Sequence, residues 1–314
     1  MDVVFCGTPA FAVPALRALL DSDNFRVRLV VCQPDRPSGR GLQLTAPPTK
    51  ELALERGVAV AQPAQLKKND EFRAQLQAIA PQAIVVVAYG RIIPPWMIAL
   101  PPLGNINLHA SLLPKYRGAA PIQWAIARGE TTTGVTAMRI VVGLDTGDIL
   151  LQRELPIEAE DTAETLAPKV AAIGAPLLLE TLRGLRAGTI TPQPQDHSQA
   201  TVAPLLKKED GHIDFQRTAT EIANRLRGFT PWPGAYAFFR GKTLHLWQAR
   251  PACAPPNQLE PEPGSFYSVG EHLYLQCGDH TSLEIRELQL EGKRRMSVRE
   301  FLNGYRPRAG ERLG

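Results

Sequence analysis

Length, composition and charge describe an ordinary globular protein. The chain has 314 residues, 44% of them hydrophobic and 21% charged, and a formal net charge of +4. This length suggests about two domains, and so small a positive charge permits a polyanionic partner without requiring one.

Three features of the sequence favour a cytoplasmic protein. No apolar run reaches the roughly 18–20 residues needed to span a bilayer, so we expect no membrane association. An acid, Asp2, stands where a secretory signal would carry basic residues. The four cysteines are scattered without the Cys/His spacing of a zinc site, which favours reduced thiols and no bound metal.

Strands and helices alternate through the first part of the chain. The apolar run Val3–Cys6 leads through Gly7 into a helical pattern, and the turn lacks the G-x-G-x-x-G spacing of a dinucleotide site. Further strands are predicted at 27–31, 58–61, 83–88, 105–109, 135–141 and 148–155, and helices at 49–56, 72–79, 121–128 and 162–186. This alternation predicts an α/β fold with a doubly wound, mostly parallel, Rossmann-like sheet covered on both faces. Pro168 and Pro176 should kink or break the last helix.

The pattern changes after residue 189. Residues 190–206 are mostly polar and rich in Pro, Gln and Thr, which is typical of a linker. Short β runs then follow at 236–239, 243–248, 265–269, 273–276 and 283–290, separated by turns with Gly or Pro. Five short strands predict a small OB-like β-barrel. We therefore expect a catalytic domain over 1–189, a linker over 190–206 and a barrel over 207–314.

The strand at 105–109 carries polar residues that could do chemistry. Asn107 and His109 alternate with Ile106 and Leu108, so the amide and the imidazole share one face of the strand. Pro114 follows closely and places this pair at the strand's carboxyl end, where open α/β sheets bind ligands. An imidazole can move a proton, and an amide can hydrogen-bond an oxyanion. By spacing alone, a packed histidine and a turn asparagine fit equally well.

Asp145 is the candidate partner for this histidine. It lies between Gly143 and Gly147 in a loop between two predicted strands, from which a carboxylate can turn inward. There it could orient the imidazole and favour its charged form. Its alternative role is that of an ordinary turn residue.

The combined motif resembles the folate-dependent formyltransferases. The string N-x-H-x-S-L-L-P-K-Y-R-G-x-x-P runs from Asn107 to Pro121 and is followed by Asp145 in G-x-D-x-G. The resemblance implies that Asn107, His109 and Asp145 form the catalytic set. It also implies that the donor is 10-formyltetrahydrofolate and that Tyr89, within 88–92, offers its backbone to the pterin. The remaining folate-binding residues that it implies are Ser111, Leu112, Leu113 and Pro114.

A basic loop over Pro34–Pro48 suggests the acceptor. Arg36 and Arg40 stand there among Gly and Pro, and guanidinium groups suit phosphates and unstacked bases. A mobile surface loop is the alternative reading. The string P-D-R-P-x-G-R-G is similar to the insertion of formyltransferases that act on methionyl-tRNA, which implies contact with the acceptor end of the tRNA. Lys207 and Lys208 could contact phosphates after the linker.

The resemblance implies transfer of a formyl group to the α-amino group of methionyl initiator tRNA, for translation initiation. Asn107, aided by protonated His109, would stabilise the oxyanion, and His109 would pass the proton to the departing folate nitrogen. Three alternatives stay open: a formyltransferase acting on an amino sugar nucleotide, a glycinamide-ribonucleotide formyltransferase, and a non-catalytic RNA-binding module. No heptads are visible, so we expect a monomer.

Overall fold

The computed structural model describes residues 1–38, 43–253 and 262–314, and it divides the chain into two compact units. Unit 1 consists of Met1–Pro121, Thr132–Pro156 and Ala167–Ala203. Unit 2 consists of Ile122–Thr131, Ile157–Leu166 and Pro204–Gly314. The boundaries predicted at 189 and 206 stay a prediction.

Unit 1 is built on a seven-stranded sheet in the order β10-β9-β7-β6-β1-β2-β5. The strands from β7 to β5 are parallel, whereas β9 and β10 run antiparallel at one edge. This arrangement confirms the mostly parallel, Rossmann-like sheet predicted from the sequence. The strands are β1 (Asp2–Gly7), β2 (Arg26–Val31), β5 (Val60–Ala61), β6 (Ala83–Val87), β7 (Asn105–His109), β9 (Thr132–Arg139) and β10 (Ile149–Pro156).

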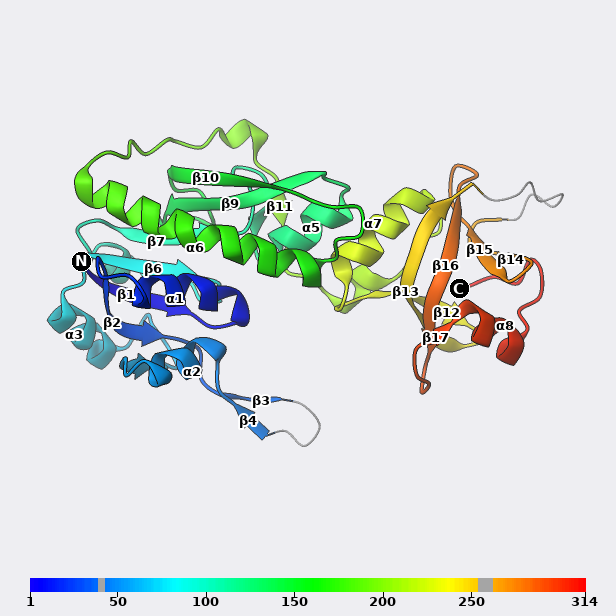
Figure 1. Ribbon diagram of the computed structural model, residues 1–314, viewed down its shortest axis with the longest axis horizontal. Helices are drawn as coiled ribbons and strands as arrows, with labels where there is room; N and C mark the ends of the chain where they lie inside the picture. The colour runs from blue at the N-terminus through cyan, green and yellow to red at the C-terminus, as the bar shows by residue number, and fades with distance from the viewer. Residues whose placement is uncertain (39–42, 254–261) are drawn as a thin grey trace. The chain divides into compact units, whose positions relative to one another are not determined.

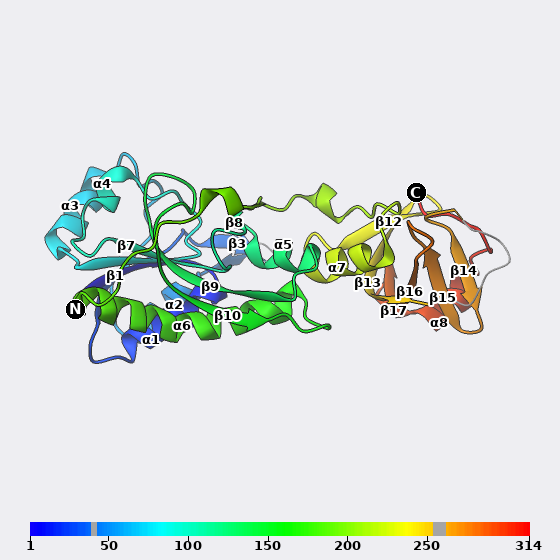
Figure 2. The same ribbon diagram turned by 90° about the horizontal axis from the view of Figure 1, so that it is seen from above.

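Helices cover both faces of this sheet, which explains why β6 is apolar and buried at every position. Helices α1 (Val13–Leu20) and α6 (Ala163–Ala187) lie on one face, and α3 (Asp70–Ile79) and α4 (Pro95–Ile98) on the other (Figures 1 and 2). Phe72 of α3 packs into the buried cluster formed by alternate residues of β1, β2 and β6. A short 3-10 turn, Ala10–Ala12, precedes α1.

Helix α6 runs continuously past both of its prolines. Of the two outcomes predicted for Pro168 and Pro176, a break is therefore wrong, because the packing of the apolar face outweighs the lost backbone bonds, and a kink stays a prediction. Leu166, Val170 and Leu178 of this helix are fully buried. By length and composition alone α6 could cross a membrane, but half of its most apolar window is buried inside the protein, as in a core helix.

Two short strands of the basic loop, one near its start and one near its end, pair to form a β-hairpin. Strand β3 (Arg36–Ser38) pairs antiparallel with β4 (Gln43–Thr45), and helix α2 (Pro48–Glu55) follows. The strands were not expected from the Pro/Gly-rich sequence. Arg40 lies outside the described residues.

The segment after α6 is hydrogen-bonded to the rest of unit 1 as far as Ala203. Gln193 forms an antiparallel bridge with Ile149. Strand β11 (Val202–Ala203) pairs parallel with β8 (Arg117–Gly118), which lies just beyond the Asn107/His109 strand. This segment, expected to be a linker, is thus in contact with the region of the predicted site.

Unit 2 contains an antiparallel sheet in the order β12-β13-β16-β15-β14, with β17 beside β16. The C-terminal residues join its two edges, because Gly314 pairs with Phe238 on β12 while Glu311 and Leu313 bond to residues at β14. The sheet therefore closes on itself, as an OB-like barrel requires. The strands are β12 (Ala235–Phe239), β13 (Lys242–Ala252), β14 (Phe266–Val269), β15 (His272–Gln276), β16 (Ser282–Leu290) and β17 (Met296–Ser297).

Three helical elements accompany this sheet: α7 (Ala219–Phe229), α8 (Val298–Tyr305) and the 3-10 turn Lys208–Gly211. Helix α8 was not predicted, although a capping box of Ser297 and Glu300 marks its start. In unit 2, α7 also packs on α5 (Pro121–Ala127), where Phe229 and Trp124 meet edge to face at 5.2 Å.

Candidate active site

The sheet places Asn107 and His109 at the carboxyl end of β7. Asn107 pairs with Val86 of β6 and Met138 of β9, and His109 pairs with Thr136 of β9. The Asn107 side chain is half-buried and has no hydrogen-bond partner within residues 1–38, 43–253 and 262–314. His109 is 6% exposed. The amide is therefore available to a ligand, and the imidazole is largely shielded from water.

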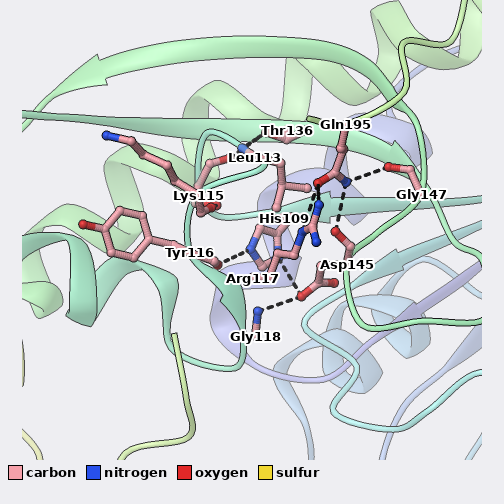
Figure 3. Close-up of polar contacts among 11 residues, drawn as sticks. His109, Leu113, Lys115, Tyr116, Arg117, Gly118, Thr136, Asp145, Gly147 and Gln195 are labelled. Carbon is pink, nitrogen blue, oxygen red and sulfur yellow. Dashed lines mark hydrogen bonds and ion pairs between the residues drawn. The ribbon is translucent and has the colours of Figure 1, made fainter. Parts of the chain in front are cut away.

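The two ring nitrogens of His109 have different partners. Nε2 lies 2.8 Å from the carbonyl oxygen of Tyr116, and Nδ1 lies 3.7 Å from Oδ2 of Asp145 (Figure 3). A carbonyl can only accept a hydrogen bond, so Nε2 carries the proton of the neutral ring. Nδ1 is then the nitrogen that gains or loses a proton. The separation from Asp145 suits an ion pair, but it is longer than a hydrogen bond.

Asp145 is held in an unusual backbone conformation. Its φ is +51°, in the left-handed region that non-glycine residues adopt rarely. The N–H of Gly118 donates to Oδ2 of Asp145 at 2.8 Å, so the oxygen that faces the imidazole is also fixed from the neighbouring loop.

Both glycines of the G-x-D-x-G motif are required by the backbone of this loop. Gly143 has a φ of +141°, which side-chain-bearing residues rarely adopt. A Cβ on Gly147 would lie 1.9 Å from the carbonyl oxygen of Arg139, so the loop can approach β9 only with glycine there.

The loop after β7 is fixed by residues that the sequence did not reveal. The hydroxyl of Thr136 donates to the carbonyl of Ser111 at 2.6 Å and accepts from the N–H of Leu113 at 3.1 Å. Gln152 Nε2 donates to both the Leu113 carbonyl and the Thr136 hydroxyl, each at 2.9 Å. A buried threonine opposite the histidine on the adjacent strand gave no recognisable sequence signal, because the pairing of β7 with β9 is a long-range feature.

The predicted folate residues differ in what they can offer a ligand. Ser111 and Leu113 are buried, and the Ser111 hydroxyl donates to the Lys115 carbonyl at 2.7 Å. Leu112 and Pro114 are half-buried. The first pair therefore shapes the loop, and the second pair retains exposed surface.

Tyr89 can contribute to a ligand site through its backbone. Its ring lies in the core of unit 1, where burial raises the pKa of the phenol well above its ordinary value. Its carbonyl oxygen already accepts hydrogen bonds from Thr8 and Gln33. The role predicted for the Tyr89 backbone stays a prediction.

The predicted tRNA-binding residues lie on the surface, as far as they are described. Arg36 is exposed, and its guanidinium donates to the side-chain oxygen of Gln33 at 2.6 Å. Lys207 and Lys208 are exposed at the start of the 3-10 turn. Among the residues that the structure describes, no group of three or more His, Cys, Asp or Glu could hold a metal ion.

The Rossmann-like sheet and the Asn107/His109 pair facing Asp145 fit the class of protein that the sequence resembles, the formyl transferases. The family described as formyl transferase matches residues 1–182, and the formyl transferase C-terminal domain matches residues 205–306. The chain therefore belongs to the formyl transferase family.

Two relatives narrow this assignment, and one solved structure supports the fold. The methionyl-tRNA formyltransferase of Koribacter versatilis is 60% identical over 314 residues, covering 100% of this chain and 99% of the relative. That of Acidobacterium capsulatum is 60% identical and covers 100% of both chains. A structure of WlaRD, a sugar 3N-formyl transferase in the presence of dTDP and 5-N-formyl-THF, has a TM-score of 0.64. It is 18% identical and covers 94% of this chain and 99% of that chain, so it supports the fold alone.

Proposed function

We propose that this chain transfers the formyl group of 10-formyltetrahydrofolate to the α-amino group of methionyl initiator tRNA, giving N-formylmethionyl-tRNA. The observation that carries this proposal is 60% identity to two methionyl-tRNA formyltransferases along their whole length. A folate donor agrees with the fold, because the structure of WlaRD, a sugar 3N-formyl transferase, was determined in the presence of 5-N-formyl-THF.

Asn107 stabilises the charge that develops during the transfer. Its unpartnered amide shares a face of β7 with His109, at the strand end where α/β sheets bind ligands. There it donates a hydrogen bond to the formyl oxygen as the amine forms its bond to the formyl carbon. The bond between that carbon and the folate nitrogen then breaks.

His109 carries the proton between the two nitrogens of the reaction. Nε2 is occupied by the Tyr116 carbonyl, so Nδ1 takes the proton from the attacking amine and passes it to the departing folate nitrogen. Asp145, 3.7 Å away, favours the charged ring while it holds this proton. The imidazole ends neutral, so the residues balance the transfer without a metal.

The acceptor end of the tRNA contacts the hairpin in this proposal. Arg36 on β3 is exposed, and Arg40 lies in the same loop of the sequence. Lys207 and Lys208 supply exposed positive charge near the start of the Pro204–Gly314 segment of unit 2. The protein acts as a cytoplasmic monomer.

An amino sugar nucleotide is the second candidate acceptor, because WlaRD shares the fold. The test is formyl transfer from 10-formyltetrahydrofolate to charged initiator tRNA, with an amino sugar nucleotide in parallel. We expect kcat/KM on the tRNA to exceed that on the sugar by several orders of magnitude. Equal or faster transfer to the sugar would contradict the proposal.

A further inference from the structure

The segment that follows α6 supplies one buried polar side chain to the site, Gln195. It is 6% exposed, although its surroundings in the sequence are polar. Its amide nitrogen donates to the carbonyl oxygens of Asp145 at 2.9 Å and Gly147 at 2.7 Å. One side chain therefore fixes the backbone on both sides of Thr146, in the loop that carries the proposed partner of His109 (Figure 3).

The other end of the same amide holds the second loop of the site. Gln195 Oε1 accepts hydrogen bonds from Nε and Nη2 of Arg117, at 3.1 and 2.6 Å. Arg117 lies between Tyr116, whose carbonyl accepts from the imidazole, and Gly118, whose N–H donates to Asp145. Gln195 thus joins the two loops that hold the His109–Asp145 pair.

Backbone contacts place this segment independently of the Gln195 side chain. The N–H of Arg117 donates to the carbonyl of Thr201 at 2.9 Å, and the Thr201 hydroxyl accepts from the N–H of Tyr116 at 2.9 Å. Strand β11 continues this pairing. A substitution at Gln195 therefore removes its own hydrogen bonds while the main-chain attachment of the segment stays.

The conformation of Asp145 explains why such a contact matters. A left-handed aspartate persists where its surroundings fix it, and two hydrogen bonds from a buried amide do so here. Without them the loop can relax, and the 3.7 Å approach of Oδ2 to Nδ1 is lost. A displacement of about 1 Å at a reacting site can cost on the order of 10²-fold in rate.

We propose that Gln195, held by Arg117, is a positioning residue that sets the distance between Asp145 and His109. This inference rests on the proposed function, because it assigns the purpose of the contact to the proton transfer at His109. In this proposal residues 190–203, which belong to the segment expected to be a linker, contribute a side chain that positions Asp145.

The first test replaces Gln195 with Met, which is similar in length but cannot donate or accept these bonds. We expect kcat for formyl transfer to fall about 10–100-fold, with KM for tRNA and folate changing less than threefold. Gln193→Met is the matched control, because the Gln193 side chain is exposed and contacts the Thr191 carbonyl. The control should keep the wild-type kcat.

The second test compares the NMR signals of the His109 ring in wild type and Gln195→Met, without substrate. Asp145 is the charged group facing the ring, and Arg117 and His197 are the other charged or titratable groups of the network. A displaced carboxylate changes the surroundings of Nδ1. We therefore expect the ring chemical shifts of His109 to change in Gln195→Met and to keep their wild-type values in Gln193→Met.

A double-mutant cycle separates positioning from general loss of structure. If Gln195 acts through Asp145, adding Gln195→Met to Asp145→Asn should lower kcat no more than twofold further. A multiplied loss, or His109 ring signals that are unchanged in Gln195→Met, would overturn the inference. If that variant does not fold, Gln195→Glu decides, since it keeps the acceptor for Arg117 and loses both donated bonds. A kcat for it within twofold of wild type would overturn the inference.

Failure of the proposed function gives a different result. Wild-type protein that does not formylate methionyl-tRNA contradicts the proposed acceptor, whereas the substrate-free NMR comparison still reports whether Gln195 positions Asp145 against the ring.

Discussion

At the scale of single residues, the same polar side chain can have either a structural or a chemical role, and its partners decide which. His109 and His272 both face a carboxylate, Asp145 at 3.7 Å and Glu284 at 3.0 Å. His109 is buried beside the unpartnered amide of Asn107, whereas His272 lies on an exposed surface with its partner already bound by Arg250. The arrangement around His109 leaves the Asn107 amide free to bind a ligand, whereas His272 and Glu284 bond to partners within the protein.

Glu284 provides a prediction about stability and pH. Burial alone would raise the pKa of this carboxyl, but hydrogen bonds from Arg250 and His272 and the nearby charge of Arg286 outweigh it and lower the pKa. A carboxyl with a depressed folded-state pKa stabilises the fold above its unfolded pKa, and this contribution is lost as pH falls through the folded value.

We therefore expect Glu284→Gln to reduce the free energy of unfolding by about 1–2 kcal/mol at pH 7. The difference from wild type should narrow as pH falls below about 4.3, the ordinary pKa of a glutamate. Urea unfolding at several pH values measures both. Glu271→Gln, at an exposed position of the same unit, is the control and should change little. A difference that does not depend on pH would show that the carboxylate charge is not involved.

At the scale of elements, the C-terminal residues act as a strand that closes the barrel. Leu313 is 4% exposed within the core of unit 2, and its N–H donates to the Gly264 carbonyl. We expect Leu313→Ala to lower the free energy of unfolding of this unit by about 2–4 kcal/mol. Leu205→Ala, at a leucine that is 71% exposed, should change it by less than about 0.5 kcal/mol. Equal effects of the two changes in chemical denaturation would contradict the closing role.

The hairpin β3–β4 provides the prediction about tRNA. Arg40→Ala should raise KM for methionyl-tRNA and leave the affinity for folate unchanged, because the proposal assigns it to phosphates of the acceptor end. Loss of one phosphate contact should also reduce the slope of log KM against log salt by about 0.7–1. Arg17→Ala, at an exposed arginine of α1, is the control. An unchanged KM and an unchanged salt slope for Arg40→Ala would remove the argument for this loop.

Elements with strong local signals could be predicted from the sequence, and elements fixed by distant partners could not. The apolar runs of β1, β2 and β6 and the pattern of α3 are local, and the structure has them within a few residues of the prediction. Strand β8 was missed, because its two residues acquire their partner β11 only in the folded chain.

The residues of the candidate site also divide into those that the sequence predicts and those that only the fold brings into place. Asn107, His109 and Asp145 lie in recognisable motifs, and the structure brings the last two together. Thr136, Gln152 and Gln195 hold the loops around them, yet each is an ordinary polar residue whose partner lies 16 to 78 positions away in the chain. A motif identifies the side chains that contact a ligand. The side chains that position those residues are recognised only in the folded structure.

At the scale of the whole molecule, the formyl transferase family matches residues 1–182 and its C-terminal domain matches residues 205–306, while the two relatives align with the chain from end to end. A glycinamide-ribonucleotide formyltransferase would leave residues 207–314 unexplained, and a non-catalytic RNA-binding module would not explain the His109–Asp145 pair. A single formyl transfer at the carboxyl end of β7 therefore underlies the proposals, in which Lys207 and Lys208 of unit 2 help to bind the acceptor tRNA.

The most direct measurement of that reaction is the single-turnover rate of formyl transfer to methionyl initiator tRNA by His109→Ala. We predict a fall of about 10²–10⁴-fold relative to wild type, with the affinity for 10-formyltetrahydrofolate retained. A rate within threefold of wild type would contradict the assignment of proton transfer to His109.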